Sequence, residues 1–501
     1  DRDWPLGDIV HSAPAVQKIP FDSNADGIDD GSKSYIYVGA NDGMLHAFDG
    51  DTGNELWAFI PPDQLPRLQK LLDDGHDYFV DGTVSVIERE NSTLLFFGER
   101  RGGPYYYALD ITAPLQPVYK YAVNEAHLEQ LDWDEDGEME FAATGATLGQ
   151  SWSRPHKVKL KVGDAAQELL LLTGGYDAAN QDNTESPAAT DTAGRAIFAI
   201  APDTGEVTGL NVNGALWTTM THSILDASPI DRDIDGTVDM IYAGDLGGNI
   251  LALRDKDQTG VWEKHRLFDL PATLTVAGQT INLGQKFMYA PEVGGTKYGE
   301  MVYVGTGDRE DPTGTGFTDA IYAIPSTWVN IGVGADVQYK TLTPADLVDV
   351  TDNRIQLGTD EEKSAIQAAL AEKKGWFIRF SPGEKIFSSP ILYNKVLYFT
   401  TYTPGTDTES FTDPCSSNLD RGVARLYAID YMNGGGKFLI EGEPARSMDI
   451  GTSIPSAPAV VTTDDAVKIV VGVEGGVVTK DPPGGDDDDV LFKQFFWRQI
   501  R

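Results

Sequence analysis

The sequence lacks several features that would stabilise or anchor a protein of another class. Its 501 residues include one cysteine, so no internal disulfide can form. That residue, Cys415, lies in a polar segment where we expect a loop thiol without chemistry. No apolar run approaches the roughly 20 residues of a membrane-spanning helix, and no basic and apolar leader opens the chain. We therefore predict a protein that is not integral to a membrane.

Positively charged residues are also scarce. The chain has 39 Lys and Arg residues against 77 Asp and Glu residues, which gives a net charge of −38. Such an acidic surface repels phosphate backbones, so we expect no nucleic-acid partner and an affinity for cations instead. Hydrophobic residues make up 41% of the chain and aromatic residues 10%, which is enough for a large packed core. The composition thus excludes wholesale disorder.

What the sequence does contain is a repeat. A segment with Asp-Gly at its centre lies at 79–84, and similar apolar segments built around a proline recur at 11–16, 152–155, 227–230, 289–293, 388–392 and 456–460. They lie about 74 residues apart on average, and each precedes two strand-like segments joined by a Gly/Asp turn, most clearly at 35–49. A fourth strand often follows an Asp-Thr-Gly turn, as at 51–57 and 203–207. Four strands repeated seven times predict an all-β, seven-bladed β-propeller that occupies 1–501 as a single domain.

A repeat of this length leaves room for inserted loops and short helices, because propeller repeats are commonly about 40–50 residues long. The segment near 63–78 has a helical spacing of apolar residues. The segment 359–376 has a stronger one, with acids at its start and lysines at its end to match the helix dipole. We predict helical insertions at both places.

Three acidic segments carry a spacing that suits calcium. Each reads Asp-x-[Asp/Asn]-x-Asp-Gly-x-x-[Asp/Glu]: oxygens at the first, third and fifth positions converge, the seventh residue offers a backbone carbonyl and the ninth closes the shell. Calcium needs this many hard oxygens, whereas zinc would want His or Cys ligands, which these segments lack. In order of preference, the predicted ligand sets are Asp231, Asp233, Asp235, Thr237 and Asp239; Asp22, Asn24, Asp26, Ile28 and Asp30; and Asp132, Asp134, Asp136, Glu138 and Glu140.

These segments are not EF-hands. An EF-hand loop continues to a bidentate Glu at its twelfth position, where these segments have Lys33, Ala143 and Tyr242. The chain also leaves each segment as a predicted strand rather than a helix. A single such motif in an acidic protein is compatible with a solvated turn, but three copies of the whole pattern favour at least one calcium site.

Several motifs together resemble a known family. Segments along the whole chain are similar to the C-terminal propeller of the PilY/PilC family, the tip-associated biogenesis factors and adhesins of bacterial type IV pili: Trp4–Pro14, Val38–Asp49, Phe59–Pro62, Leu148–Pro155, Asp231–Asp239 and Phe496–Gln499. The resemblance implies that a larger N-terminal region precedes this chain. The abrupt start at Asp1 agrees with a processed protein or a piece of a longer one.

The resemblance also implies a function. Calcium held by Asp231, Asp233, Asp235, the Thr237 carbonyl and Asp239 would tune pilus extension against retraction, and with it twitching motility, surface attachment and virulence. The implied partners are type IV pilus components such as minor pilins, together with a host-cell receptor. The implied location is the bacterial cell surface and pilus, associated with the outer membrane after export through the periplasm. Some family members carry an Arg-Gly-Asp motif for integrins, which this sequence lacks.

Two other interpretations use a similar fold. Pyrroloquinoline-quinone dehydrogenases are also calcium-binding propellers, but their sites typically use a vicinal disulfide that one cysteine cannot form, although some members lack it. A periplasmic scaffold of the outer-membrane assembly type is the second alternative. Dye-linked turnover with the quinone would identify the enzyme, and minor pilin genes beside the parent gene would favour the pilus factor over the scaffold. We predict that the chain is not an enzyme.

Overall fold

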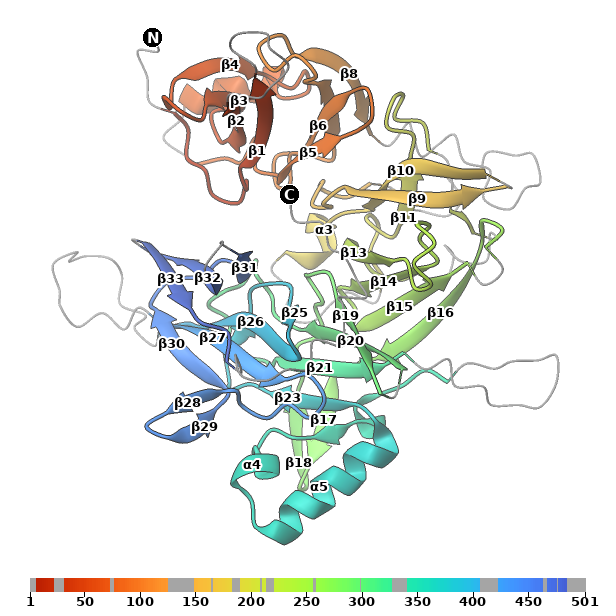
Figure 1. Cartoon of the computed structure of the whole chain (residues 1–501), viewed down its shortest axis with the longest axis vertical. Coiled ribbons are helices and arrows are strands. Elements are labelled where there is room, and N and C mark those ends of the chain that lie inside the picture. Colours follow the sequence, from red (N-terminus) through yellow and green to blue (C-terminus); the bar gives the residue numbers. More distant parts are fainter. Residues whose placement is uncertain are drawn as a thin grey trace, which may run out of the picture. The chain divides into compact units, whose positions relative to one another are not determined.

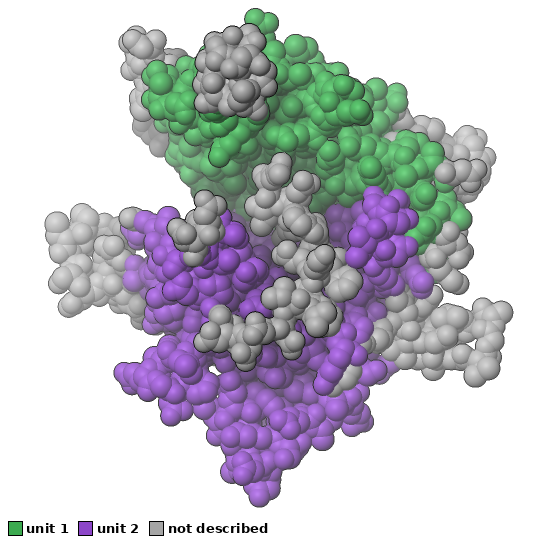
Figure 2. All heavy atoms as spheres, in the orientation of Figure 1, with its two compact units in different colours: residues 1–181, 190–226, 255–263 green, residues 182–189, 227–254, 264–501 purple. Residues whose placement is uncertain are grey.

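The computed structural model divides into two compact units. Unit 1 comprises 1–181, 190–226 and 255–263, and unit 2 comprises 182–189, 227–254 and 264–501 (Figure 2). The residues that the structure describes are 6–21, 31–72, 76–124, 148–163, 165–182, 190–207, 210–212, 220–255, 258–297, 299–326, 340–405, 422–462, 466–474 and 476–483.

Unit 1 contains three antiparallel sheets whose strands follow each other in chain order (Figure 1). The first sheet has four strands, β1 (Ala15–Phe21), β2 (Gly31–Ala40), β3 (Met44–Asp49) and β4 (Glu55–Phe59). The second has β5 (Val84–Glu88), β6 (Thr93–Gly98), β7 (Tyr106–Asp110) and β8 (Val118–Val123). The third has β9 (His156–Val162), β10 (Ala165–Thr173) and β11 (Ile197–Ile200).

Four further sheets follow along the chain. The fourth has the strand order β12-β16-β15-β14-β13, with β12 (Asn211–Val212), β13 (Ile224–Ile230), β14 (Met240–Asp245), β15 (Asn249–Arg254) and β16 (Val261–Asp269). The fifth has the order β19-β20-β21-β23-β22, with β19 (Glu292–Thr296), β20 (Gly299–Gly305), β21 (Ala320–Pro325), β22 (Val348–Asp349) and β23 (Trp376–Arg379). The sixth is built from β24 (Lys385–Ile386), β25 (Ile391–Tyr393), β26 (Val396–Thr403), β27 (Val423–Asp430) and β30 (Ser447–Gly451), and the seventh from β31 (Ala459–Thr462), β32 (Val467–Val473) and β33 (Gly476–Lys480).

Helices and small hairpins are inserted between these sheets. The hairpins are β17 (Thr273–Val276) with β18 (Gln279–Asn282), and β28 (Phe438–Ile440) with β29 (Glu443–Ala445). The helical elements are η1 (Leu65–Leu72), α3 (Ala178–Gln181), η3 (Pro344–Asp346), α4 (Arg354–Leu357) and α5 (Asp360–Lys373). In the part of the chain that the structure describes, no helix has both the length and the apolar character to cross a membrane.

The two segments predicted to be helical differ in kind. Within 359–376 lies α5, an α-helix whose Thr359 side chain accepts a hydrogen bond from the Glu362 N–H while the Glu362 carboxylate accepts one from the Thr359 N–H. This capping box, the acids of the first turn and Lys373 in the last turn explain why the helix forms there. Within 63–78 the helix is of the tighter 3₁₀ type, confined to Leu65–Leu72.

Alternate side chains of a strand point to opposite faces of its sheet, and in strands such as β14, β20 and β21 both faces are buried. In β20, Val302 and Val304 belong to one core cluster with Met240 and Tyr242 of the fourth sheet. Met301 and Tyr303, the residues between and beside them, belong to another cluster with residues of the sixth sheet such as Leu397, Phe399 and Ile429. A strand period of two therefore places every second residue against a different neighbouring sheet.

Similar packing joins other successive sheets. Tyr37 and Leu45 of the first sheet share a cluster with Phe97 and Tyr107 of the second. Tyr398 and Leu426 of the sixth share one with Ile469 and Val471 of the seventh. Seven successive sheets of mostly antiparallel strands, with this packing between the first and second and from the fourth to the seventh, make the seven-bladed β-propeller that the repeats predict.

The predicted fourth strands are only partly present. The Asp51–Trp57 segment leads into β4 as expected. Around 203–207, however, the chain forms no named strand, and Val207 makes an isolated bridge to Ile200. Gly205 adopts φ +75° in this turn, as the Asp-Thr-Gly pattern predicts, although 203–207 itself forms no strand.

A buried carboxyl pair lies beneath η1 in unit 1. Glu99 follows β6 and is fully buried, and the Gln64 side-chain amide donates to Glu99 Oε1 and to Asp63 Oδ2, at 2.8 Å each. Glu99 Oε2 has no donor among the described residues. Burial raises the pKa of Glu99 well above its usual range, and the neighbouring charge of Asp63 raises it further. A proton on Glu99 removes the cost of a buried negative charge.

Because the pKa of Glu99 is higher in the folded than in the unfolded protein, its contribution to stability is greatest at low pH and decreases as the pH rises from the unfolded to the folded pKa. A Glu99→Gln variant keeps the shape and can donate an amide N–H to Asp63, but it does not titrate. We expect it to lose less stability than the wild type as the pH rises above the ordinary glutamate pKa, as measured by urea unfolding. The exposed Glu443→Gln change should follow the wild type. Parallel pH profiles for Glu99→Gln and the wild type would contradict the assignment.

Candidate metal centre

The acidic segment that ranks first in the sequence forms the connection between β13 and β14 in unit 2. The backbone N–H of Asp239 donates to the Ile230 carbonyl at 3.1 Å and closes the base of this loop. Residues 233–236 are exposed, whereas Thr237 and Val238 are buried again where the chain enters β14. A surface loop is therefore fixed at both ends by strands of a packed sheet.

Three carboxylates converge in this loop. One oxygen from each of Asp231, Asp233 and Asp235 lies within 4.8 Å of the others. Asp231 is oriented by the backbone, because its two oxygens accept the N–H groups of Asp235 at 3.1 Å and Gly236 at 2.7 Å. Like charges at this separation repel each other, so the loop favours a cation among them.

The backbone of the loop adopts conformations that most residues avoid. Gly236 has φ +90°, and a Cβ there would meet no atom within 4 Å, so the dihedral angle rather than the space favours glycine. Ile234 has φ +61°, which is unfavourable for a β-branched residue. The hydrogen bonds of the turn maintain this geometry, which brings the carboxylates to one side.

The ninth residue, Asp239, is half-buried at the end of the loop. Its Oδ1 accepts the N–H of Arg232 at 3.2 Å. Burial raises the pKa of Asp239 to about 6, Arg232 opposes this shift, and the charges of Asp233 and Asp231 add to it. The carboxylates of this segment thus carry more negative charge than the neighbouring positive groups neutralise.

The positively charged side chain of the segment, Arg232, binds a residue outside the loop. Arg232 donates from Nε and Nη2 to the two carboxylate oxygens of Glu300 on β20, at 2.6 Å each. The Tyr242 hydroxyl donates to the same Glu300 at 2.8 Å. This anchor ties the loop to the fifth sheet and orients the guanidinium toward Glu300. Sequence reasoning missed it because Arg232 and Glu300 are 68 residues apart, with no motif linking them.

The donor set fits a hard cation. Asp231, Asp233, Asp235 and Asp239 offer carboxylate oxygens and the Thr237 backbone a carbonyl, and calcium prefers such ligands. The structure brings the first three of these residues together, as the spacing predicts. The other two predicted loops, 22–30 and 132–140, lie outside the described residues, and so does Cys415. Those predictions stay open.

The fold and this loop together define a β-propeller that presents an acidic, all-oxygen loop between two strands. Comparison with known families identifies the kind of propeller. The model of the PilY1 beta-propeller domain matches residues 6–263, just over half of the chain, so the chain belongs to this family. The resemblance that the motifs indicate is confirmed.

Similar proteins have names that agree with this membership. A type IV pilus biogenesis factor PilY1 homolog of Xylella fastidiosa is 27% identical over 514 residues, covering 93% of this chain and 32% of that protein. The type IV pilus biogenesis factor PilY1 of Pseudomonas aeruginosa PAO1 is 32% identical over 270 residues, covering 49% of this chain and 20% of that protein. The chain thus spans a third or less of the length of these relatives.

A solved structure supports the fold. The C-terminal domain of Pseudomonas aeruginosa PilY1 superposes with a TM-score of 0.59 at 18% sequence identity, covering 90% of this chain and 93% of that one. At this identity the match concerns the architecture, and it agrees with the seven-bladed assignment.

The Arg232–Glu300 anchor generates a test of the loop. In Glu300→Gln the guanidinium loses its charged partner and becomes free to turn toward Asp233 and Asp235, where it would compete with a bound cation. We expect calcium affinity, measured by titration calorimetry, to fall roughly fivefold, the equivalent of about 1 kcal/mol. Glu443→Gln, an exposed change outside the loop, should leave the affinity unchanged. An unaltered affinity in Glu300→Gln would show that the anchor does not position the loop.

Proposed function

We propose that this chain is the calcium-binding propeller of a type IV pilus biogenesis factor. The observation that carries the proposal is the convergence of three carboxylate oxygens within 4.8 Å in a chain of the PilY1 family. The named relatives are pilus biogenesis factors rather than enzymes, which favours this function over a quinone-dependent dehydrogenase. It also favours it over a general periplasmic scaffold.

The loop would act as a two-state element. Bound calcium supplies two positive charges that compensate the carboxylates. Asp231, Asp233, Asp235 and Asp239 would hold it with carboxylate oxygens, and Thr237 with its carbonyl. Without the cation, repulsion among the carboxylates opposes the turn that brings them together. Loop order would then follow the calcium concentration, and the anchor at Glu300 would connect that order to the fifth sheet.

The role in the cell follows from the family. We propose that the pilus machinery responds to the state of this loop and that the loop supports pilus extension against retraction, twitching motility and surface attachment. The partners would be pilus components such as minor pilins, with a host-cell receptor as a further one. The chain would act at the cell surface and pilus, associated with the outer membrane after export through the periplasm.

The first test is direct binding. Asp235→Ala removes one of the three converging carboxylates, so we expect the number of calcium ions bound per chain, measured by titration calorimetry, to fall by one. The fold should remain, because one surface loop contributes little to a core of this size. Asp51→Ala, an exposed acid in the first sheet, is the matched control. Unchanged stoichiometry and affinity in Asp235→Ala would remove this loop from the proposal and leave 22–30 and 132–140 as candidates.

The second test concerns the role of the loop in the cell. In the full-length gene, Asp235→Ala should alter twitching motility or surface piliation without changing the amount of protein. Asp235→Lys places a positive charge among the remaining carboxylates and should hold the loop in its calcium-like state, with the opposite motility phenotype. Asp51→Ala should twitch like the wild type. If both Asp235 variants also twitch normally while calcium binding is lost, the loop only stabilises the structure.

A further inference from the structure

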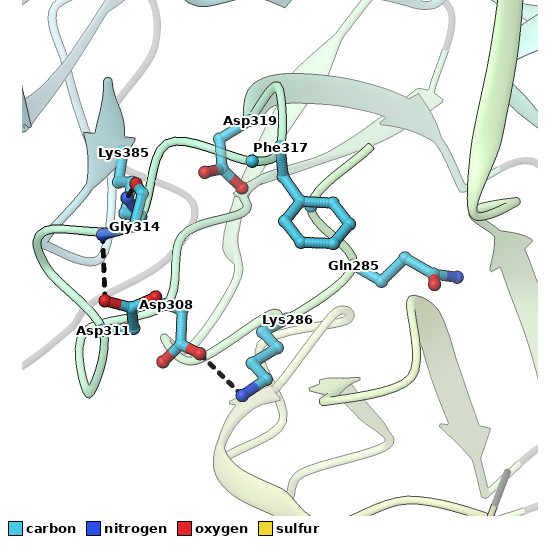
Figure 3. Close-up of a pocket in the computed structure, with 10 residues that line it drawn as sticks. Gln285, Lys286, Asp308, Asp311, Gly314, Phe317, Asp319 and Lys385 are labelled. Atoms are coloured by element: carbon cyan, nitrogen blue, oxygen red, sulfur yellow. Dashed lines mark hydrogen bonds and ion pairs between the residues drawn. The ribbon is translucent and has the colours of Figure 1, made fainter. Parts of the chain in front are cut away.

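A cavity unrelated to the acidic loop lies within unit 2. Three segments line it: 284–286 between β18 and β19, 308–319 between β20 and β21, and Lys385 at the start of β24 (Figure 3). Its volume is about 30 Å³, which suits a small polar group or a few waters. The lining combines charges of both signs with the aromatic ring of Phe317.

One of these charges is a buried lysine. The Lys385 side chain is 95% buried, and its ammonium donates to the Gly314 carbonyl. Across the described ranges, no carboxylate oxygen lies within ion-pair distance of this ammonium. Burial lowers the pKa of Lys385, although the more distant charges of Asp319, Asp311 and Asp308 oppose this. An ammonium has three N–H donors, so the protein leaves part of its capacity to the cavity.

The opposite charge is a buried aspartate. Asp319, which directly precedes β21, is 97% buried, and its burial raises its pKa to about 6, against a hydrogen bond from the Thr306 hydroxyl. No cationic side chain of the described segments reaches it at ion-pair distance. One of its oxygens packs directly on the backbone of Gly284, where a Cβ would lie 1.9 Å away. A glycine at 284 is therefore needed to seat this carboxylate.

The other charged groups of the lining already have partners. Lys286 Nζ pairs with Asp308 Oδ2 at 2.6 Å, and Asp311 accepts the Gly314 N–H at 2.9 Å (Figure 3). Lys385 and Asp319 are thus the two fully buried charged groups of the lining without an ion-pair partner among the described residues, whereas Asp311 is only half-buried. Phe317 forms an apolar wall beside Asp319 (Figure 3).

We propose that this cavity binds the charged head group of a small zwitterion of the α-amino acid class. The ligand carboxylate accepts from Lys385, the ligand ammonium donates to Asp319, and an apolar side chain lies against Phe317. A buried charge without a counter-charge is costly, and such a ligand compensates both at once. A neutral diol could satisfy the hydrogen bonds, but it would leave both charges unpaired. The cavity holds only the head group, which agrees with its size.

The ligand itself offers the first test. Titration calorimetry of the full chain with the twenty L-amino acids should find at least one apolar member, such as L-leucine, with a Kd of about 1 mM or tighter. N-acetyl-L-leucine lacks the ammonium and L-leucinamide lacks the carboxylate. Each should bind about tenfold or more weakly, because a hydrogen bond between charged groups is lost. No binding by any amino acid, or equal binding by the two blocked ligands, would overturn the proposal.

Variants assign the two contacts. In Asp319→Asn, N-acetyl-L-leucine and L-leucine should differ less in affinity than they do in the wild type, because the contact to the ligand ammonium is already lost. In Lys385→Met, L-leucinamide and L-leucine should likewise differ less, because the contact to the ligand carboxylate is already lost. Lys159→Met, an exposed lysine on β9, should bind like the wild type. Binding that is insensitive to both pocket variants, or a preference for neutral monosaccharides such as glucose over L-leucine, would also overturn it. If a variant fails to fold, the affinities of the wild type for N-acetyl-L-leucine and L-leucinamide still test the proposal.

Discussion

Burial of both faces of strands such as β14, β15, β20 and β21 is the constraint on which the rest of the structure depends. In β20, Val302 and Val304 fill one core cluster while Met301 and Tyr303 fill the next. A polar residue on either face loses its water, at a cost of several kcal/mol in the worst case unless a partner compensates it, as Arg232 does for Glu300 on β20. Few strand positions are therefore available for binding residues. We expect such residues mainly in the segments that connect the strands.

Both candidate sites follow from this constraint. The acidic loop joins β13 to β14, and the Asp239 N–H to Ile230 bond marks the point where the packed sheet ends and the loop begins. The cavity is formed by the connections before β19 and between β20 and β21, with Lys385 where β24 starts. In each case strands of packed sheets position side chains that face solvent or a cavity. The ends of such a segment are fixed by the strands, while the residues at its centre can adjust to a ligand.

The sequence predicted the parts of the structure that depend on local chemistry. The alternation around Tyr35–Asp49 and the Asp-Gly turns indicated strands and blades, and the spacing of Asp231, Asp233 and Asp235 indicated three converging carboxylates. What it could not predict depends on residues that only the fold brings together. Arg232 and Glu300 are 68 positions apart. Lys385 and Asp319 come from different sheets, and neither stands in a motif that would distinguish it from any other charged residue.

The chain carries far more acid than base, and burial decides how each group of carboxylates is neutralised. At Glu99, fully buried beside Asp63, burial and the neighbouring charge raise the pKa, so a proton neutralises the group. At Asp233 and Asp235, which are exposed, water and ions have free access, so a hydrated cation can exchange with the medium. Asp319 lies between these limits: it is buried, yet it lines a cavity. A buried carboxylate that lines a cavity can be neutralised by a molecule larger than a proton, and the cavity selects that molecule by its shape. We therefore expect ligand specificity at the cavity rather than at the exposed loop.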